Sequence, residues 1–211
     1  MNQQLNSKIY QFSWYCKEER WSSYWHQVNE ILKCNPQTIL EIGIGDKFLG
    51  NYIKNNTTIK YQSLDINPEL KPDIISSVEK IPLADNSFDL VCAFEVLEHL
   101  PFTKLGQVLS ELSRVSKRYI ILSLPHWGRH FSLEIRLPFF KIIRWQYKVN
   151  LFPIKHTFNG SHYWEIGKKG YSLKKLKSIF KANKIKIIKD YIAFTSPYHH
   201  FFILEKVKST D

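Results

Sequence analysis

Apolar positions along the chain recur with two periods, one typical of helices and one typical of strands. Apolar and aromatic residues at helical spacing over residues 17–33 predict a leading helix, which Pro36 terminates. Runs of β-branched and apolar residues at 38–41 and 61–66 predict the first two strands, and residues 47–55 predict a short helix between them. The chain therefore begins as helix, strand, helix and strand.

The same alternation continues through the middle of the chain. A short third strand is predicted at residues 73–76, a fourth at 88–94 and a fifth at 118–124, with a helix at 103–116 between the last two. Alternating strands and helices imply a parallel sheet joined by right-handed crossovers. Ligands of such sheets bind at the carboxyl ends of the strands.

The regular order stops after the fifth strand. Residues 126–165 are aromatic, basic and interrupted by proline, which predicts an insertion. A helix resumes over residues 172–182 with Ser172 as its N-cap. Residues 184–194 and 198–207 then predict two final strands joined by a tight turn.

A glycine turn follows the first strand. This strand ends on Glu41 and runs into Gly43 and Gly45, which let the backbone approach a ligand closely. Asp65, at the end of the second strand, is placed to bind the hydroxyls of a ribose. Phe48 stands where a dinucleotide-binding turn has its third glycine, and the charge of Glu41 disfavours a pyrophosphate. The turn therefore favours a cationic nucleoside over a dinucleotide.

Two further motifs follow the glycine turn in a recognisable order and spacing. They are Ile-Pro-Leu-Ala-Asp-Asn-Ser-Phe-Asp-Leu-Val at residues 81–91 and Phe-Glu-Val-Leu-Glu-His-Leu-Pro at residues 94–101. With them the chain resembles the class I S-adenosylmethionine-dependent methyltransferases, in the type 11 group that contains the ubiquinone-biosynthesis enzymes. The resemblance covers residues 36–125 and implies a Rossmann-like α/β fold. That fold has a seven-stranded, mostly parallel sheet with helices on both faces and an antiparallel terminal strand pair, here with an aromatic and basic insertion after the fifth strand.

The resemblance also implies the cofactor, S-adenosylmethionine, and how it is bound. Glu41 favours the ammonium and sulfonium groups, Asp65 holds the ribose, and Ile66 either covers the adenine or belongs to the core. Ser77 stands where many relatives have an aspartate that binds the adenine amino group, so this contact weakens or moves to the backbone at Val78. The expected cofactor-binding residues are Glu41, Gly43, Gly45, Asp65, Ile66, Ser77, Val78, Phe94 and Glu95.

Within this framework we expect a single domain over residues 1–211, since a chain of this length can bury a full core. Its expected parts are a leading helical segment, a cofactor-binding core, a substrate-side insertion or lid, and a final helix with the terminal strands, at residues 1–35, 36–125, 126–170 and 171–211.

Methyl transfer from a sulfonium depends mainly on positioning, but a hydroxyl acceptor would also benefit from a base. His126 follows the fifth strand, where the fold puts the acceptor, and His156 and His162 are the other candidate bases. Each of the three has the alternative of a structural, hydrogen-bonded histidine.

A second open question concerns Glu95, Glu98 and His99, which share one predicted helical turn. With His162 they would suit magnesium or another small divalent ion, as in some ubiquinone-pathway and small-RNA 2′-O-methyltransferases with a similar pattern. Alternatively, Glu98 and His99 only begin a helix. No residue is assigned to a metal from the sequence.

The net charge of +11 is unevenly distributed, because residues 1–125 carry a net −1 and residues 126–211 a net +12. This favours an anionic partner: a phosphate-bearing substrate, nucleic acid or a membrane surface. A solvated lysine-rich face explains the charge equally well. Residues 137–149 combine apolar and basic side chains as a membrane-interfacial segment does, although a lid over the cofactor is preferred. We expect most aromatic residues of the insertion to form a small core of its own: Trp127, Phe139, Phe140, Trp145, Tyr147, Phe152 and Trp164.

The three cysteines, Cys16, Cys34 and Cys92, lack metal-binding spacing and are odd in number, which favours a reducing compartment, the cytoplasm. Neither a signal peptide nor a spanning segment is expected. The expected function is a methyltransferase acting at oxygen or nitrogen of a small-molecule, glycan or lipid-linked acceptor. The alternatives are an RNA methyltransferase that uses the basic C-terminal part, and a non-catalytic cofactor-binding subunit; the oligomeric state is left open.

Overall fold

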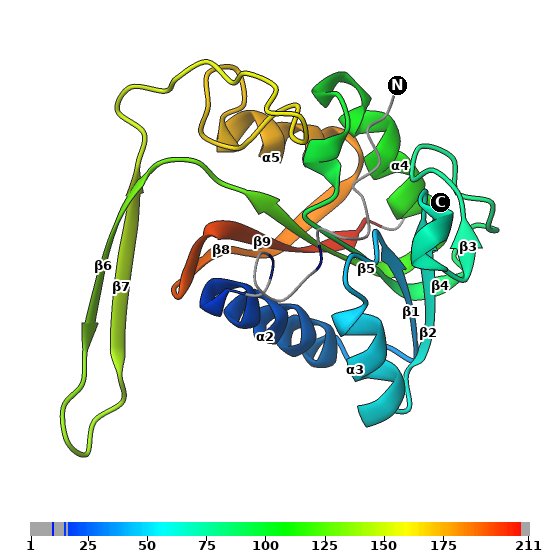
Figure 1. Cartoon of the computed structure of the whole chain (residues 1–211), viewed down its shortest axis with the longest axis horizontal. Coiled ribbons are helices and arrows are strands. Elements are labelled where there is room, and N and C mark those ends of the chain that lie inside the picture. The colour runs from blue at the N-terminus through cyan, green and yellow to red at the C-terminus, as the bar shows by residue number, and fades with distance from the viewer. Residues whose placement is uncertain (1–9, 11–14, 16, 208–211) are drawn as a thin grey trace.

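The computed structural model describes residue 10, residue 15 and residues 17–207. In this part of the chain a seven-stranded sheet runs in the order β3-β2-β1-β4-β5-β9-β8 (Figure 1). Its strands are β1 (Thr38–Ile42), β2 (Lys60–Asp65), β3 (Ile74–Ile75), β4 (Phe88–Phe94), β5 (Ser116–Pro125), β8 (Ile185–Ala193) and β9 (Ser196–Lys206). A separate two-stranded sheet pairs β6 (Arg129–Ile135) with β7 (Ile143–Val149). The helices are α2 (Glu18–Lys33), α3 (Phe48–Asn56), α4 (Leu105–Val115) and α5 (Leu173–Ala182), with short 3-10 turns η2 (Pro68–Leu70), η3 (Leu97–His99) and η4 (Phe102–Lys104).

The pairing of the strands confirms the predicted α/β class. Strand β1 lies between β2 and β4 and is parallel to both, and β4 is parallel to β5. Strand β9 is antiparallel to both β5 and β8, which is the expected terminal pair. The carboxyl ends of β1, β2 and β4 therefore lie at one edge of the sheet, where ligands of such folds bind.

Helices cover both faces of the sheet, as Figure 1 shows. In β1, Leu40 and Ile42 pack into the cluster formed with α4 and α5, whereas Ile39 packs toward α2 and α3. Successive side chains of a strand point to opposite faces, so a strand covered on both sides needs apolar residues at every position. This is why the central strands β4 and β5 carry apolar runs at residues 90–94 and 120–122.

The ends of several elements follow local chemistry. Helix α2 ends at Lys33, and Asn35 adopts a left-handed conformation (φ 47°) just before Pro36. Ser172 caps α5 as predicted, its hydroxyl accepting a hydrogen bond from the backbone N–H of Lys175. Helix α4 is preceded by the 3-10 turn η4, so the helix proper begins two residues after the predicted start at 103.

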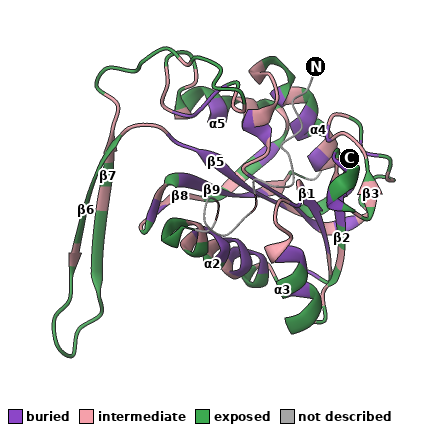
Figure 2. Ribbon diagram, viewed as in Figure 1, coloured by how far each residue is buried: buried purple, intermediate pink, exposed green. Residues whose placement is uncertain are grey.

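The insertion after β5 differs from the expectation. Strands β6 and β7 form a long hairpin beyond the β8 edge of the main sheet, and Figure 2 shows it to be largely exposed. The prediction that its aromatic residues form a small core is wrong, because Phe139, Phe140, Trp145, Tyr147 and Phe152 are all exposed. Two strands enclose no interior, so their side chains have no third element to pack against. Trp164 is buried, but in the main core.

Among the described residues, none of the helices has the length and apolar content needed to cross a membrane. Cys34 and Cys92 are free thiols, and Cys16 lies outside the described residues.

The packing of α5 gives a test of the core. Phe180 is fully buried, and its ring lies edge-on to Phe202 of β9 at 5.4 Å between centroids. Phe180→Ala should lower the free energy of unfolding by about 3–5 kcal/mol, because it leaves a cavity under the helix. Urea unfolding measures this change. Ile188→Ala, at an exposed position on β8, should change it by less than about 0.5 kcal/mol, and equal losses in both variants would contradict this packing.

Candidate functional site

A large cavity opens at the carboxyl edge of the sheet. Its volume of about 1190 Å³ exceeds the roughly 300–1,000 Å³ of a pocket for one small ligand, so a cofactor and an acceptor fit together. The described residues that line its cofactor side include eight of those predicted from the sequence: Gly43, Gly45, Asp65, Ile66, Ser77, Val78, Phe94 and Glu95.

Gly43 makes the sharp turn after β1 possible. Its φ of +75° is in the left-handed region, and a Cβ atom there would lie 2.4 Å from Cγ2 of Val96. The backbone N–H of Gly43 donates to the carbonyl of Leu64, which joins the turn to β2. A side chain at this position would push apart the loops that follow β1 and β4.

Asp65 holds the same turn from the end of β2. One carboxylate oxygen accepts the backbone N–H of Ile44 at 2.9 Å, and the other accepts that of Asn67 at 2.8 Å. A carboxylate has about four acceptor positions, so both oxygens keep capacity for hydroxyl donors from the cavity that Asp65 lines. This geometry suits the predicted ribose contact.

Glu41 lies apart from the other predicted cofactor residues. It is not among the described residues that line the cavity, and its buried carboxyl accepts a hydrogen bond from the hydroxyl of Tyr61. Burial raises the pKa of Glu41 to about 8, although the Tyr61 hydroxyl opposes the shift. Glu41 therefore does not contact a ligand in the cavity, and its carboxyl instead holds Tyr61 beside β1.

Glu95 directly follows β4 and has a strained, left-handed conformation (φ 55°). Its carboxyl accepts a hydrogen bond from the Ser123 hydroxyl at 2.9 Å, and its other oxygen is 3.7 Å from Nε2 of His199. Burial raises the pKa of Glu95 to about 7. Glu95 therefore connects the ends of β4, β5 and β9 at the floor of the cavity.

The opposite wall comes from the segment between the hairpin and α5. Phe158 and residues 160–163 line it. Trp164 anchors this segment, because its buried indole N–H donates to the carbonyl of Leu100 at 3.1 Å. The backbone N–H of Tyr163 donates to the carbonyl of Glu98 at 2.8 Å. The wall is thus fixed against the loop that follows β4.

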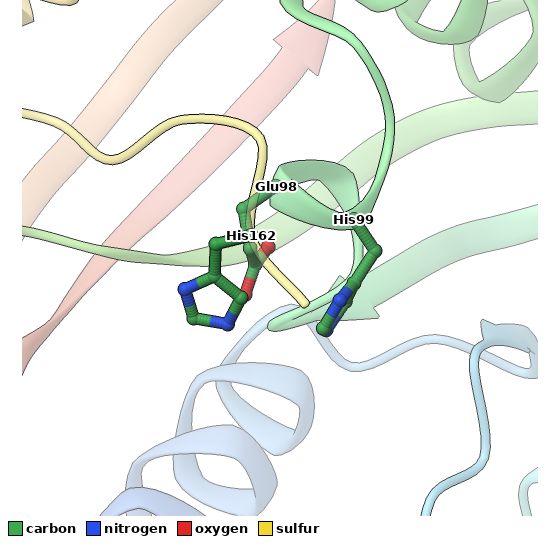
Figure 3. A group of neighbouring side chains, drawn as sticks. All are labelled: Glu98, His99 and His162. Carbon is green, nitrogen blue, oxygen red and sulfur yellow. The ribbon is translucent and has the colours of Figure 1, made fainter. Parts of the chain in front are cut away.

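Glu98, His99 and His162 come together where these two segments meet (Figure 3). One potential ligand atom from each lies within 4.8 Å of the others, and Nε2 of His162 is 3.9 Å from a carboxylate oxygen of Glu98. Glu98 is fully buried, and neither of its oxygens has a hydrogen-bond partner among the described residues. A buried carboxyl without partners is costly, which points to a group that satisfies it.

Neighbouring groups orient both histidine rings. Nδ1 of His99 is 3.0 Å from the carbonyl of Ser161, and Nδ1 of His162 is 3.2 Å from the carboxylate of Glu165. The Glu165 carboxylate only accepts, so Nδ1 of His162 carries the proton and its Nε2 keeps a free lone pair. Burial alone would raise the pKa of Glu165, but hydrogen bonds from His162 and Tyr198 outweigh it and lower that pKa to about 2.

These residues fit a divalent cation. Two imidazoles and one unpartnered carboxyl form a two-histidine, one-carboxylate donor set, which suits a transition-metal ion better than magnesium. The predicted fourth ligand, Glu95, is not part of the cluster; its carboxyl accepts a hydrogen bond from the Ser123 hydroxyl instead.

Of the three predicted bases, only His162 lines the cavity. His126 is buried beside His200, with their Nδ1 atoms 2.9 Å apart, and burial lowers its pKa to about 3. His156 donates through Nε2 to the carbonyl of His162 at 2.8 Å. The geometry therefore disfavours His126 and His156 as bases.

The cavity also contains residues that the sequence did not single out. His199 and Tyr198 line it from β9, Tyr10 and Tyr15 line it from before α2, and Arg20 lines it from the first turn of α2. The available signal was the alternation along β9, which directs His199 and His200 to opposite faces of the sheet. Nothing in the local sequence indicated that the residues before α2 reach the cofactor side.

Comparisons with known proteins agree with this geometry. Residues 40–122 match the family model for a methyltransferase domain, and no curated protein matches the chain. Together with the fold, this match confirms the predicted resemblance to the class I S-adenosylmethionine-dependent methyltransferases and supports S-adenosylmethionine as the cofactor.

Solved structures share the fold over most of the chain. A methyltransferase of Aquifex aeolicus has a TM-score of 0.59 at 15% identity, over 97% of this chain and 100% of that one. The 1,6-didemethyltoxoflavin-N1-methyltransferase of Burkholderia thailandensis, solved with S-adenosylhomocysteine, has a TM-score of 0.60 at 11% identity, over 89% and 80%. The [4+2]-cyclase SpnF has one of 0.54 at 11% identity, over 92% and 82%, so the fold alone does not fix the reaction.

The buried carboxyl of Glu41 gives a pH test. The folded state keeps a proton that the unfolded state releases, so its contribution to stability is lost as the pH rises from 4.5 to about 8. The free energy of unfolding should fall relative to Glu41→Gln by up to about 1.4 kcal/mol per pH unit in this window, measured by urea unfolding. In Tyr61→Phe, which loses the opposing hydrogen bond, the loss should extend to higher pH. Parallel pH profiles of the wild type and Glu41→Gln would contradict the shift.

Proposed function

We propose that this protein transfers the methyl group of S-adenosylmethionine to an oxygen or nitrogen of a small-molecule, glycan or lipid-linked acceptor. The observation that carries the proposal is the single cavity in which the glycine turn and Asp65 face a histidine-bearing wall. Its volume accommodates both reactants, and its two walls have different chemistry. Two free thiols are consistent with a site of action in the cytoplasm.

On the donor side, the cavity residues bind S-adenosylmethionine mainly through its uncharged ribose and adenine. Asp65 accepts the ribose hydroxyls, Ile66 and Val78 lie against the adenine, and the turn at Gly43 admits the methionine moiety. The sulfonium is already an activated leaving group, so positioning supplies most of the rate. Transfer leaves neutral S-adenosylhomocysteine and a methylated acceptor, with one proton to remove.

On the acceptor side, His162 takes that proton. Its Nε2 has a free lone pair. The hydrogen bond from Nδ1 to Glu165 stabilises the imidazolium that forms, as the carboxylate does in other histidine–carboxylate pairs that act as a general base. Tyr198 donates to the same Glu165 carboxylate at 3.0 Å and holds it in place. The acceptor atom would approach between His162 and the donor side of the cavity.

A divalent ion held by Glu98, His99 and His162 is an alternative way to activate the acceptor. A bound ion would lower the pKa of an acceptor hydroxyl and satisfy the carboxyl of Glu98. Glu165 and the Ser161 carbonyl would then act as the outer partners that orient the two histidines.

The reaction itself is tested with cofactor carrying a deuterated methyl group. Incubation with mixtures of hydroxyl- and amine-bearing small molecules, sugars and lipid-linked sugars should give a product with the labelled methyl group, detected by mass spectrometry. Cofactor binding without any labelled product would favour a non-catalytic subunit, and label in added RNA would favour an RNA methyltransferase.

Asp65→Ala should weaken binding of S-adenosylmethionine at least tenfold, roughly the value of hydrogen bonds to a charged acceptor. Titration calorimetry measures this without any acceptor. Asp65→Asn keeps one acceptor oxygen and should lose less, whereas Asp85→Ala removes an exposed carboxylate outside the cavity and should bind as the wild type does. Unchanged affinity in folded Asp65→Ala would refute the ribose assignment.

The ion site has its own test. Calorimetric titration with Mn²⁺ should show binding, and His162→Ala or Glu98→Gln should weaken it more than Glu165→Gln, since loss of an outer partner costs roughly 10–100-fold. His130→Ala, at an exposed histidine of the hairpin, is the control. If the wild type binds no Mn²⁺, the ion site is refuted and the proposal that His162 acts as a general base without a metal is the one that stands.

A further inference from the structure

The hairpin of β6 and β7 has one apolar face and one polar face. Residues directly opposite each other in the two strands point to the same side, so the register assigns every side chain to a face. One face carries three successive apolar pairs, with Arg129 opposite Val149 at its base. The pairs between them make the other face polar. The apolar pairs are Phe131 with Tyr147, Leu133 with Trp145, and Ile135 with Ile143.

The polar face lies toward the body of the protein. Gln146 donates to the carbonyl of Ile192, and Lys148 donates to the carbonyls of His126 and Pro197. The guanidinium of Arg144 lies over the ring of Phe194 at 5.3 Å. Contacts from the polar side chains thus attach the hairpin to the ends of β5 and β8.

The apolar face is left exposed instead. Its six side chains are 39–61% exposed, the reverse of the usual arrangement, in which the apolar face packs on the protein. The turn continues this surface, since Leu137, Phe139, Phe140 and Ile142 are exposed as well. Of the described residues that line the cavity, none belongs to the hairpin, so this segment does not cover the cavity in this structure as the lid interpretation expects.

We propose that this hairpin is a membrane-binding arm whose apolar face and turn enter the surface of an anionic lipid bilayer. An exposed apolar surface of this extent marks an interaction site. Aromatic side chains with neighbouring Lys and Arg are characteristic of peptides that lie in the interfacial region of a bilayer.

Charge identifies the occupant. Residues 129–149 contain five basic side chains and one acidic side chain, and this one, Glu134, is paired with Arg136 and Arg144. A second copy of the chain would bring two positively charged arms together, which is unfavourable. Anionic headgroups instead neutralise the arm while the acyl region covers its apolar face. Of the ten exposed apolar residues, six on the face and four in the turn, five are Leu or Ile. These side chains do not stack on bases as an RNA-binding surface would require.

Vesicle sedimentation tests the arm in the full-length protein. The protein should bind vesicles of equal parts phosphatidylglycerol and phosphatidylcholine, and should not bind phosphatidylcholine alone. Lys141→Glu should reduce binding by about fivefold or more, the value of removing a basic side chain at an anionic surface. The double variant Phe139→Ser and Phe140→Ser should abolish most of the binding, because both rings are exposed and their loss leaves the fold intact.

Two controls complete the experiment. Ile188→Ser removes an exposed apolar side chain from β8 outside the hairpin and should bind vesicles as the wild type does. The blue shift of tryptophan emission on vesicle addition should decrease in Trp145→Phe, which loses the indole of the apolar face.

Three results would overturn the proposal. These are equal binding to both kinds of vesicle or to neither, unchanged binding in the double phenylalanine variant, and a dimer or an RNA complex that the same variant abolishes. The inference does not rest on the proposed reaction, because vesicle binding is measured without cofactor or acceptor.

Discussion

The donor half of the site depends on one carboxylate, that of Asp65. By accepting the N–H groups of Ile44 and Asn67, it joins the ends of β1 and β2 and fixes the glycine turn between them. Gly43 must be glycine because Val96, which follows β4, occupies the space a Cβ would need. Three parallel strands are thereby held so that their carboxyl ends share one cavity. The same carboxylate then remains available to the cofactor, so structure and recognition use one group.

The acceptor half has a different origin, because much of it comes from the irregular segment between the hairpin and α5, with Tyr198 and His199 of β9 beside it. Trp164, which is buried and bonded to Leu100 far away in the sequence, helps hold residues 160–163 at the cavity. The backbone bond from Tyr163 to Glu98 contributes as well. These contacts bring His162 beside Glu98 and His99. Glu98 is buried at this junction without a hydrogen-bond partner among the described residues, and the proposed chemistry of this wall makes use of that cost.

The fold could be predicted from the sequence because strands covered on both faces and amphipathic helices leave strong periodic signals, as in β1 and α5. The cofactor side followed from the glycine turn and Asp65, since both lie next to strand ends. The histidines could not be sorted in this way, because whether His126, His156 or His199 faces the cavity depends on long-range packing. The prediction of a small core in the hairpin was wrong for a related reason. Alternation shows that one face of Phe131 to Ile135 is apolar, but not which way that face points.

The polar contacts that attach the hairpin explain why its apolar face points outward, the reverse of the usual arrangement. The Lys148 ammonium donates to carbonyls at the end of β5 and at the start of β9, and burial lowers its pKa to about 8. The hydrogen bonds to these two carbonyls compensate for that burial and turn Phe131 and Trp145 outward. Lys148 binds Pro197, and the next two residues, Tyr198 and His199, line the cavity. The exposed arm and the acceptor wall are therefore connected through a few rigid contacts, so a surface that binds the arm would also orient the cavity relative to it.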